Sequence, residues 1–287
     1  MNLQEASKYI QSHLSEIYNE REAHNICALL LEDITSFSKT ERLINKELQL
    51  NNVQSKQIEK ALEMLMKFKP IQQILGYTWF AGNKFFVNES VLIPRPETEE
   101  LIEQIVLENR NKNISILDIG TGSGCIAISL KHQLPNVNIT AVDISTDALE
   151  IAKKNAESIG VSVDFFQLDF LNENTWPTLK CFDIIVSNPP YIRDNEKQQM
   201  CHNVVQYEPH SALFVPDDRA LIFYEKIVAF AATHLNAGGM ILVEINESLG
   251  KETLELFISK GFKAELKKDM QQKDRIIKVF SSDNVCK

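Results

Sequence analysis

The sequence lacks the features of secreted, membrane-spanning and zinc-binding proteins. Its 287 residues include only 5 cysteines, which are widely scattered without a CxxC or Cys/His ligand spacing. That scatter argues against a disulfide framework or a metal site, and it favours a reducing cytoplasm. The charge-free stretch from Ile227 to Val243 is interrupted by polar residues and a Gly-Gly pair. We therefore expect no membrane span and, because the N-terminus is polar, no secretory signal.

Positive charge is also scarce. The chain has 30 Lys and Arg against 39 Asp and Glu, which gives a formal net charge of −9. Residues 1–75 contain 10 acidic and 9 basic side chains, so most of the excess negative charge lies after them. This balance disfavours broad contact with a nucleic-acid backbone.

The length is near twice the usual domain size of about 150 residues, which favours two domains. Apolar residues recur every three or four positions up to about Gly76, and this spacing predicts a helical domain over residues 1–75. For residues 76–110 we expect a β-hairpin turning at Gly82-Asn83 and a linker, in which Thr98 caps a helix. Residues 111–287 form the second predicted domain.

Strand-like and helical segments alternate in this second domain, which predicts an α/β fold with a mainly parallel, doubly wound sheet. A short polar connection joins the last two strands, so we expect them to form an antiparallel pair at one edge. The expected strands are Ile114–Ile119, Val137–Val142, Val163–Leu168, Phe182–Ser187, Gly239–Ile245, Phe262–Leu266 and Arg275–Phe280, and the expected helices are Cys125–Gln133, Thr146–Ser158, Ala220–Leu235 and Leu249–Ser259.

A glycine-rich segment, Asp118 to Gly124, lies where the first of these strands turns into a helix. In open α/β sheets this is the position where ligands bind, although a tight turn alone would also explain the glycines. The glycines fall at positions one, three and five, whereas a dinucleotide fingerprint requires one, three and six. The carboxylate of Asp118 would repel a pyrophosphate but could accept a hydrogen bond from an ammonium group or from an intervening water. S-adenosylmethionine, which carries no phosphate, is therefore favoured over NAD.

Two further strand ends carry acidic residues. Asp143 follows the second strand, where a carboxylate can accept both ribose hydroxyls of an adenosine, although it also suits the start of a helix. After the third strand, Asp169 could accept the adenine amino group, and Phe170 could form a wall beside the ring. A turn followed by a core phenylalanine is the alternative.

The most specific feature is the run from Asn188 through Pro189 and Pro190 to Tyr191, which follows an apolar strand. Two prolines cannot donate backbone hydrogen bonds, so the strand must end there and expose its end. The Asn188 side-chain oxygen and the Pro189 carbonyl are two acceptors for a planar NH2 group, and the Tyr191 ring could stack on it. This geometry suits methyl transfer to a conjugated nitrogen by positioning alone. A proline-rich turn is the alternative.

Together these motifs resemble class I S-adenosylmethionine-dependent amino methyltransferases. Further segments, Pro70–Gly76, Val91–Glu99, Tyr207-Glu208-Pro209 and Lys273–Arg275, resemble the HemK/PrmC family over nearly the whole chain. That family methylates the N5 amide nitrogen of the glutamine in the GGQ motif of peptide chain release factors. The resemblance implies a helical substrate-recognition domain before a Rossmann-like catalytic domain with a seven-stranded sheet.

The resemblance also assigns roles. The partners that it implies are class I release factors. With the composition and charge, we expect a cytoplasmic monomer that has neither a membrane nor a nucleic acid as partner. The sequence departs from the family at Phe170, where relatives often have tryptophan, and around Glu244, where no role is assigned. The implied cofactor contacts are Gly120, Thr121, Gly122, Ser123, Gly124, Asp143, Phe170 and Asn188; the implied substrate contacts are Asn188, Pro189, Pro190 and Tyr191; and Asn188, Pro189 and Tyr191 are implied to be catalytic.

Two rival functions remain open at this point. A nucleic-acid amino methyltransferase would share the Asn-Pro-Pro-Tyr chemistry, but the net charge disfavours it. A silent binding module would have no need of Asn188 and Tyr191. Cys125 is interpreted as a small core residue. The role of Arg95 is open, because it could line the cofactor pocket or fix the angle between the domains.

Overall fold

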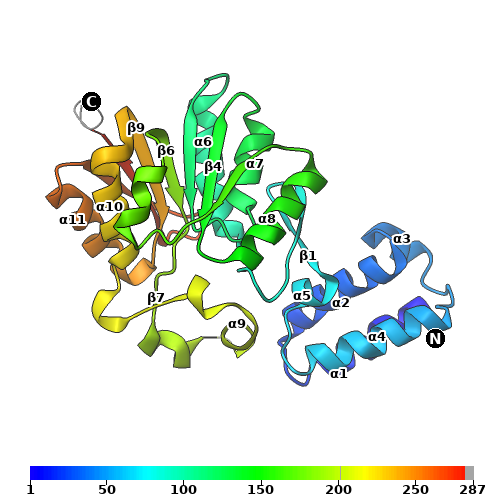
Figure 1. Cartoon of the computed structure of the whole chain (residues 1–287). Helices are drawn as coiled ribbons and strands as arrows, with labels where there is room; N and C mark the ends of the chain where they lie inside the picture. The colour runs from blue at the N-terminus through cyan, green and yellow to red at the C-terminus, as the bar shows by residue number, and fades with distance from the viewer. Residues whose placement is uncertain (201, 282–287) are drawn as a thin grey trace. The chain divides into compact units, whose positions relative to one another are not determined.

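The computed structural model describes residues 1–200 and 202–281, which form two compact units. The first unit comprises residues 1–77 and the segment 202–207, and the second comprises residues 78–200 and 208–281. Figure 1 shows a helical unit and an α/β unit. Among the described residues, no helix has the length and apolar character needed to cross a membrane.

The first unit is helical, as the spacing of apolar residues predicts. Its longer helices are capped by Asn2, Asn19 and Asn51, whose side chains accept hydrogen bonds from backbone N–H groups of the first turn. Their apolar faces share one core, which includes the fully buried Ile10 and Ile58. The helices are α1 (Leu3–Leu14), α2 (Glu20–Thr35), α3 (Lys39–Ile44), α4 (Asn52–Leu65), α5 (Ile71–Leu75) and, from the later segment, α9 (His202–Tyr207).

The second unit is built on a seven-stranded sheet in the order β10-β11-β9-β6-β3-β4-β5. The antiparallel pair lies at one edge, as predicted, with β11 antiparallel to both β10 and β9 and the other neighbours parallel. The α/β fold class is therefore confirmed. The strands are β3 (Ser115–Ile119), β4 (Asn138–Asp143), β5 (Asp164–Gln167), β6 (Phe182–Ser187), β9 (Leu235–Glu244), β10 (Lys263–Lys268) and β11 (Asp274–Phe280).

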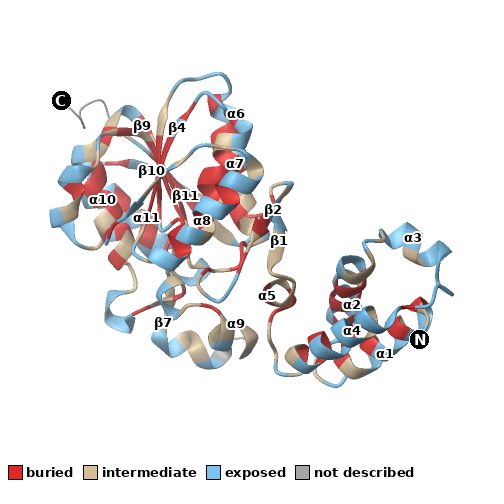
Figure 2. Cartoon of the chain, turned by 45° about the vertical axis from the view of Figure 1, so that its right-hand side comes forward, coloured by how far each residue is buried: buried red, intermediate tan, exposed pale blue. Residues whose placement is uncertain are grey.

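Helices cover both faces of this sheet (Figure 1), and alternate residues of the central strands point to opposite cores. In β3, for example, Leu117 packs into one core and Ile116 into the other. Figure 2 shows the buried strands at the centre of this unit. The covering helices are α6 (Glu99–Asn109), α7 (Cys125–Gln133) and α8 (Thr146–Ile159) on one face, and α10 (Ile222–His234) and α11 (Gly250–Ser259) on the other.

The hairpin predicted around Gly82-Asn83 is present as β1 (Tyr77–Phe80) and β2 (Asn83–Phe86). Its second strand is held by Asn155 of α8, whose side chain pairs with both the N–H and the carbonyl of Phe86. The sequence does not predict a second small sheet, in which β7 (Ile192–Arg193) pairs in parallel with β8 (Phe214–Val215). Two-residue strands leave no periodicity to detect.

Two described cysteines, Cys27 and Cys125, are free thiols. Burial raises the pKa of the Cys125 thiol to about 12, which fits the interpretation of this residue as a core residue and not as a nucleophile.

Candidate functional site

The candidate site lies at the carboxyl ends of the central parallel strands. Ile119 of β3 pairs with Val142 of β4 and with Ser187 of β6, so the three strands end level with one another. The residues that follow, Gly120, Asp143 and Asn188, all line one cavity of about 370 Å³. The topology thus gathers motifs that are far apart in the sequence.

The glycine-rich loop forms the floor of this cavity. Its backbone is fixed to β4, because the N–H groups of Gly120 and Thr121 both donate to the Val142 carbonyl. Gly120 and Gly122 have φ values of +71° and +55°, and a Cβ built at either would meet no atom within 4 Å. The backbone is therefore open to a ligand at both positions.

The side chain of Asp118 holds the glycine-rich loop through hydrogen bonds and does not line the cavity. It is fully buried, and its Oδ2 accepts hydrogen bonds from the Thr121 hydroxyl (2.6 Å) and the Ala127 N–H (3.3 Å). Its Oδ1 has no hydrogen-bond partner among the described residues. Burial raises the pKa of this carboxyl to about 7. Asp118 therefore does not line the cavity, and its contact with a cationic ligand, directly or through a water, stays a prediction.

Asp143 faces the cavity with both oxygens anchored. Its Oδ2 accepts from the Gly122 N–H at 2.8 Å and its Oδ1 from the Ser145 N–H at 2.9 Å. Burial raises its pKa, although these backbone hydrogen bonds favour the charged form. Each carboxylate oxygen keeps further acceptor capacity, which suits a pair of ribose hydroxyls.

The remaining cofactor residues of the prediction divide into two groups. Phe170 lines the cavity and is held by edge contacts with Phe230 and by a hydrogen bond from Trp176 to its carbonyl. Thr121 and Ser123 are buried and do not line the cavity. Gly124 immediately precedes α7 with φ +80°, where a Cβ would lie 2.6 Å from Ile128 Cδ1 and 3.1 Å from Ala152 Cβ.

The Asn-Pro-Pro-Tyr segment contributes Asn188 and Pro190 to the cavity wall. Pro189 is buried, and its side chain does not line the cavity. Tyr191 donates its hydroxyl to Glu244 Oε1 at 3.0 Å, and its ring packs against one of the two cores of this unit. Stacking of Tyr191 on a substrate therefore stays a prediction.

Sequence reasoning missed a buried hydrogen-bond network behind Asn188. The sequence predicts that Thr98 caps α6. In the structure its side chain accepts no hydrogen bond from the first turn of that helix. Its hydroxyl donates instead to Glu244 Oε2 at 2.7 Å and accepts from Asn188 Nδ2 at 3.1 Å. One feature of the sequence could have indicated Glu244: like Asp143, it is a carboxylate at the end of a buried strand.

A second missed residue is Glu208. This buried carboxylate accepts from the Ile93 N–H at 3.0 Å and from Arg95 at 2.6 Å. It joins the linker to the loop after α9, and both segments contribute residues to the cavity wall. Arg95, which the sequence leaves open between two roles, pairs with Glu208 and does not line the cavity.

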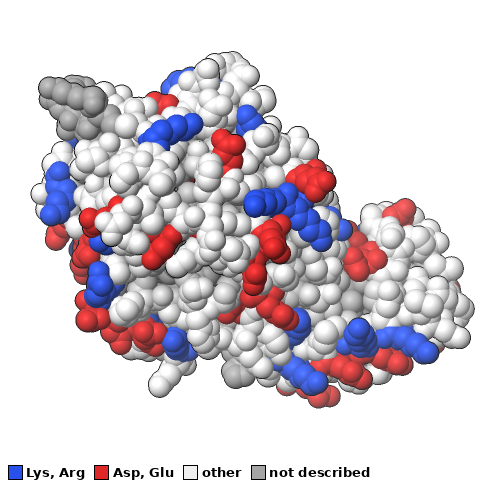
Figure 3. All heavy atoms as spheres, viewed as in Figure 1, with Lys and Arg blue, Asp and Glu red and all other residues white. Residues whose placement is uncertain are grey.

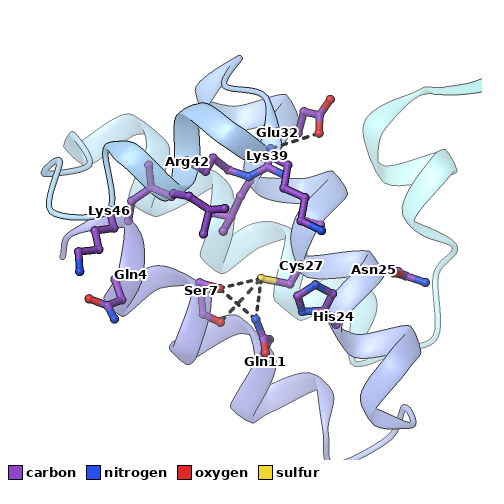
Figure 4. A pocket seen from close by; sticks show the side chains of 14 residues that line it. Gln4, Ser7, Gln11, His24, Asn25, Cys27, Glu32, Lys39, Arg42 and Lys46 are labelled. Carbon is purple, nitrogen blue, oxygen red and sulfur yellow. Dashed lines mark hydrogen bonds and ion pairs between the residues drawn. The ribbon is translucent and has the colours of Figure 1, made fainter.

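Another pocket lies within the first unit (Figure 4) and has a volume of about 480 Å³. At its base the Cys27 thiol contacts Ser7 and Gln11, while Lys39 and Lys46 lie at its rim. Burial raises the pKa of Cys27, which makes it a poor nucleophile. In the described part of the chain, no group of His, Cys, Asp or Glu residues has the arrangement needed to hold a metal ion.

Two domain families match the chain. The methyltransferase small domain matches residues 97–211, and the PrmC N-terminal domain matches residues 5–76. Among solved structures, a methyltransferase from Pyrococcus furiosus shares the fold with a TM-score of 0.51 at 17% identity, covering 81% of this chain and 100% of that one.

Curated relatives match over nearly the full length. The release factor glutamine methyltransferase of Flavobacterium psychrophilum is 46% identical over 278 residues, covering 95% of this chain and 96% of its own length. The protein of the same name from Bacteroides thetaiotaomicron is 39% identical, with 94% and 96% covered. That of Lactococcus lactis is 41% identical, with 82% and 89% covered.

Proposed function

Because the chain belongs to the family of release factor glutamine methyltransferases, we propose that it methylates the side-chain amide nitrogen of the glutamine in the GGQ motif of release factors. The similarity to the named relatives over both units carries this proposal. The rival function, methylation of nucleic acid, is not favoured. On the face drawn in Figure 3, acidic and basic side chains are interspersed, and the net charge is −9.

S-adenosylmethionine is the proposed methyl donor, and the cavity residues fit it. The open backbone at Gly120 and Gly122 leaves room for the methionine part, and Asp143 has acceptor capacity for the ribose. Phe170 supplies an aromatic wall for the adenine. Thr121, Ser123 and Gly124 do not line the cavity, so their contacts with the cofactor stay predictions.

When bound, this cofactor supplies an electrophilic methyl group on a sulfonium. The chain's own residues then act by orientation. Asn188 Oδ1 and the Pro189 carbonyl accept the two N–H bonds of the substrate amide and direct the nitrogen lone pair towards the methyl group. Pro190 forms part of the cavity wall, and the Tyr191 ring stacks on the plane of the substrate amide. In the balanced reaction the N–CH3 bond would form as the S–CH3 bond of the sulfonium breaks and leaves a thioether, and one amide N–H proton would then pass to water.

The decisive experiment supplies the protein with labelled S-adenosylmethionine and three acceptors: a release factor with an intact GGQ motif, the same factor with that glutamine changed to alanine, and a mixture of duplex DNA and ribosomal RNA. Label should appear only on the intact factor. Label on nucleic acid, or on the alanine variant, would overturn the assignment.

The role of Asn188 is tested by substitution. Asn188→Ala should reduce kcat by about 10²-fold or more because the amide acceptor is lost, while cofactor affinity changes by less than about tenfold. Calorimetric titration and single-turnover methyl transfer measure the two effects separately. An unchanged kcat would remove Asn188 from the mechanism.

A further inference from the structure

A buried carboxylate near the Asn188–Tyr191 segment accepts hydrogen bonds from two hydroxyl groups. Glu244 ends β9, is only 2% exposed, and accepts from Thr98 at Oε2 and from Tyr191 at Oε1. Thr98 is 1% exposed, and its oxygen also accepts from Asn188 Nδ2. Thr98 belongs to η1 (Pro96–Thr98), and Asn188 and Tyr191 lie in the segment after β6. All of these residues belong to the second unit.

The order of donors and acceptors in this network has a consequence for Asn188. A carboxylate can only accept, so the single hydroxyl proton of Thr98 is committed to Glu244. The Thr98 oxygen is then restricted to accepting, and it selects the NH2 end of the Asn188 amide. The Oδ1 end of the amide therefore points away from Thr98.

We propose that Glu244, through Thr98, is a positioning residue that fixes which end of the Asn188 amide faces the substrate. The inference rests on the proposed function, in which Asn188 Oδ1 accepts an N–H of the glutamine amide. A flipped Asn188 would present its own N–H groups to those of the substrate, and the two sets of donors would repel. The same carboxylate holds Tyr191, so both ends of the Asn188–Tyr191 segment are tied to one group.

The matched pair Thr98→Val and Thr98→Ser tests the hydroxyl. Valine has the shape of threonine but cannot accept from Asn188, so kcat should fall by about 10²-fold, while the KM for S-adenosylmethionine changes by less than about threefold. Serine keeps the hydroxyl and should restore kcat to within about threefold of the parent value. If the Thr98→Val variant retains the parent kcat, or if serine is as poor as valine, the proposal is wrong.

Glu244→Gln provides a second test that keeps the volume of the side chain. Its Oε1 can still accept from Tyr191, but its NH2 group would donate to Thr98 and release the Thr98 proton towards Asn188. The amide would then flip, and kcat should fall by more than about tenfold. In a Thr98→Val background the same substitution should cost less than about threefold, because the relay is already broken. If the decreases in kcat from the two substitutions were fully additive, Glu244 would not act on Asn188 through Thr98, and the proposed relay from Glu244 through Thr98 to Asn188 would be wrong.

A readout without turnover separates this inference from the proposed function. In cofactor-free protein labelled with ¹⁵N, the side-chain amide signals of Asn188 should shift in both the Thr98→Val and Glu244→Gln variants and stay near their parent positions in Thr98→Ser. If the parent protein does not methylate release factors, the proposed function fails, and these signals still decide the relay. Unshifted signals in the valine variant would overturn it.

Discussion

At the scale of single residues, three carboxylates that are buried or partly buried define the site, and each has a different role. Asp143 faces the cavity, Asp118 braces the glycine loop, and Glu244 orients Asn188. All three have raised pKa values because burial penalises the charged form. Only the first of these roles is visible in the sequence, because it follows from position in a motif. The other two depend on which atoms the carboxylates meet in the folded chain.

The raised pKa of Asp118 predicts a pH dependence of stability. Its folded pKa of about 7 exceeds its ordinary value of 3.8, so between these values the folded state binds more protons than the unfolded state. The contribution of Asp118 to the free energy of unfolding therefore falls as pH rises through this window, by up to about 1.4 kcal/mol per pH unit. Urea denaturation of the parent and of Asp118→Asn from pH 4.5 to about 7 measures the difference. Parallel pH profiles would contradict this prediction.

Residue-level prediction was weakest for Thr98. A threonine before acidic residues and an apolar run is a typical helix cap, and local sequence favours that interpretation. The hydroxyl bonds instead to Glu244, which lies 146 residues away along the chain. Such long-range partners override local preference, and no single sequence reveals them. Glu208 and its contact to Ile93, 115 residues apart, were missed for the same reason.

At the scale of elements, the sequence predicts the central strands and helices to within a few residues. The buried strands are continuous apolar runs between polar turns, so β6 matches its predicted bounds, Phe182–Ser187, at both ends. The strand β9 begins at Leu235, four residues earlier than predicted, because the Gly238-Gly239 pair continues the strand with a register shift opposite β6. Glycine pairs usually indicate a turn, which explains the error.

Elements also lock one another in place, and Asn155 is the test case. This fully buried residue of α8 bonds to the N–H and carbonyl of Phe86 in β2 and to the Ser123 carbonyl in the glycine loop. Asn155→Ala should lower the free energy of unfolding by about 3 kcal/mol, because buried backbone groups lose their partners. Cofactor affinity should fall as well, since the loop is loosened.

The exposed Asn136 supplies the control for that experiment. Its substitution by alanine should change the free energy of unfolding by less than about 0.5 kcal/mol. Chemical denaturation and calorimetric titration are measured on both variants. Equal stabilities for the two would show that Asn155 does not join these elements.

At the scale of the whole molecule, the two units have separate hydrophobic cores. The core of the first unit contains Ile10, and one of the cores of the second contains Ile277; both side chains are fully buried. Ile10→Ala should weaken the first unit by about 2 to 5 kcal/mol, and Ile277→Ala should do the same to the second. Hydrogen exchange should show faster amide exchange only in the unit that carries the substitution. Equal acceleration in both units would contradict independent cores.

The edges of the seven-stranded sheet bear on how the protein behaves at high concentration. An edge strand presents unpaired backbone groups to which a strand of another chain can add. At one edge β10 carries Lys263, Lys267 and Lys268, and at the other β5 has only four residues. The strand also carries Glu265, which forms an ion pair with Lys267, so Lys263, Glu265 and Lys267 place charge at every second position of β10. Charged side chains on an edge strand disfavour the addition of another strand, and this should limit aggregation through the longer edge of the sheet.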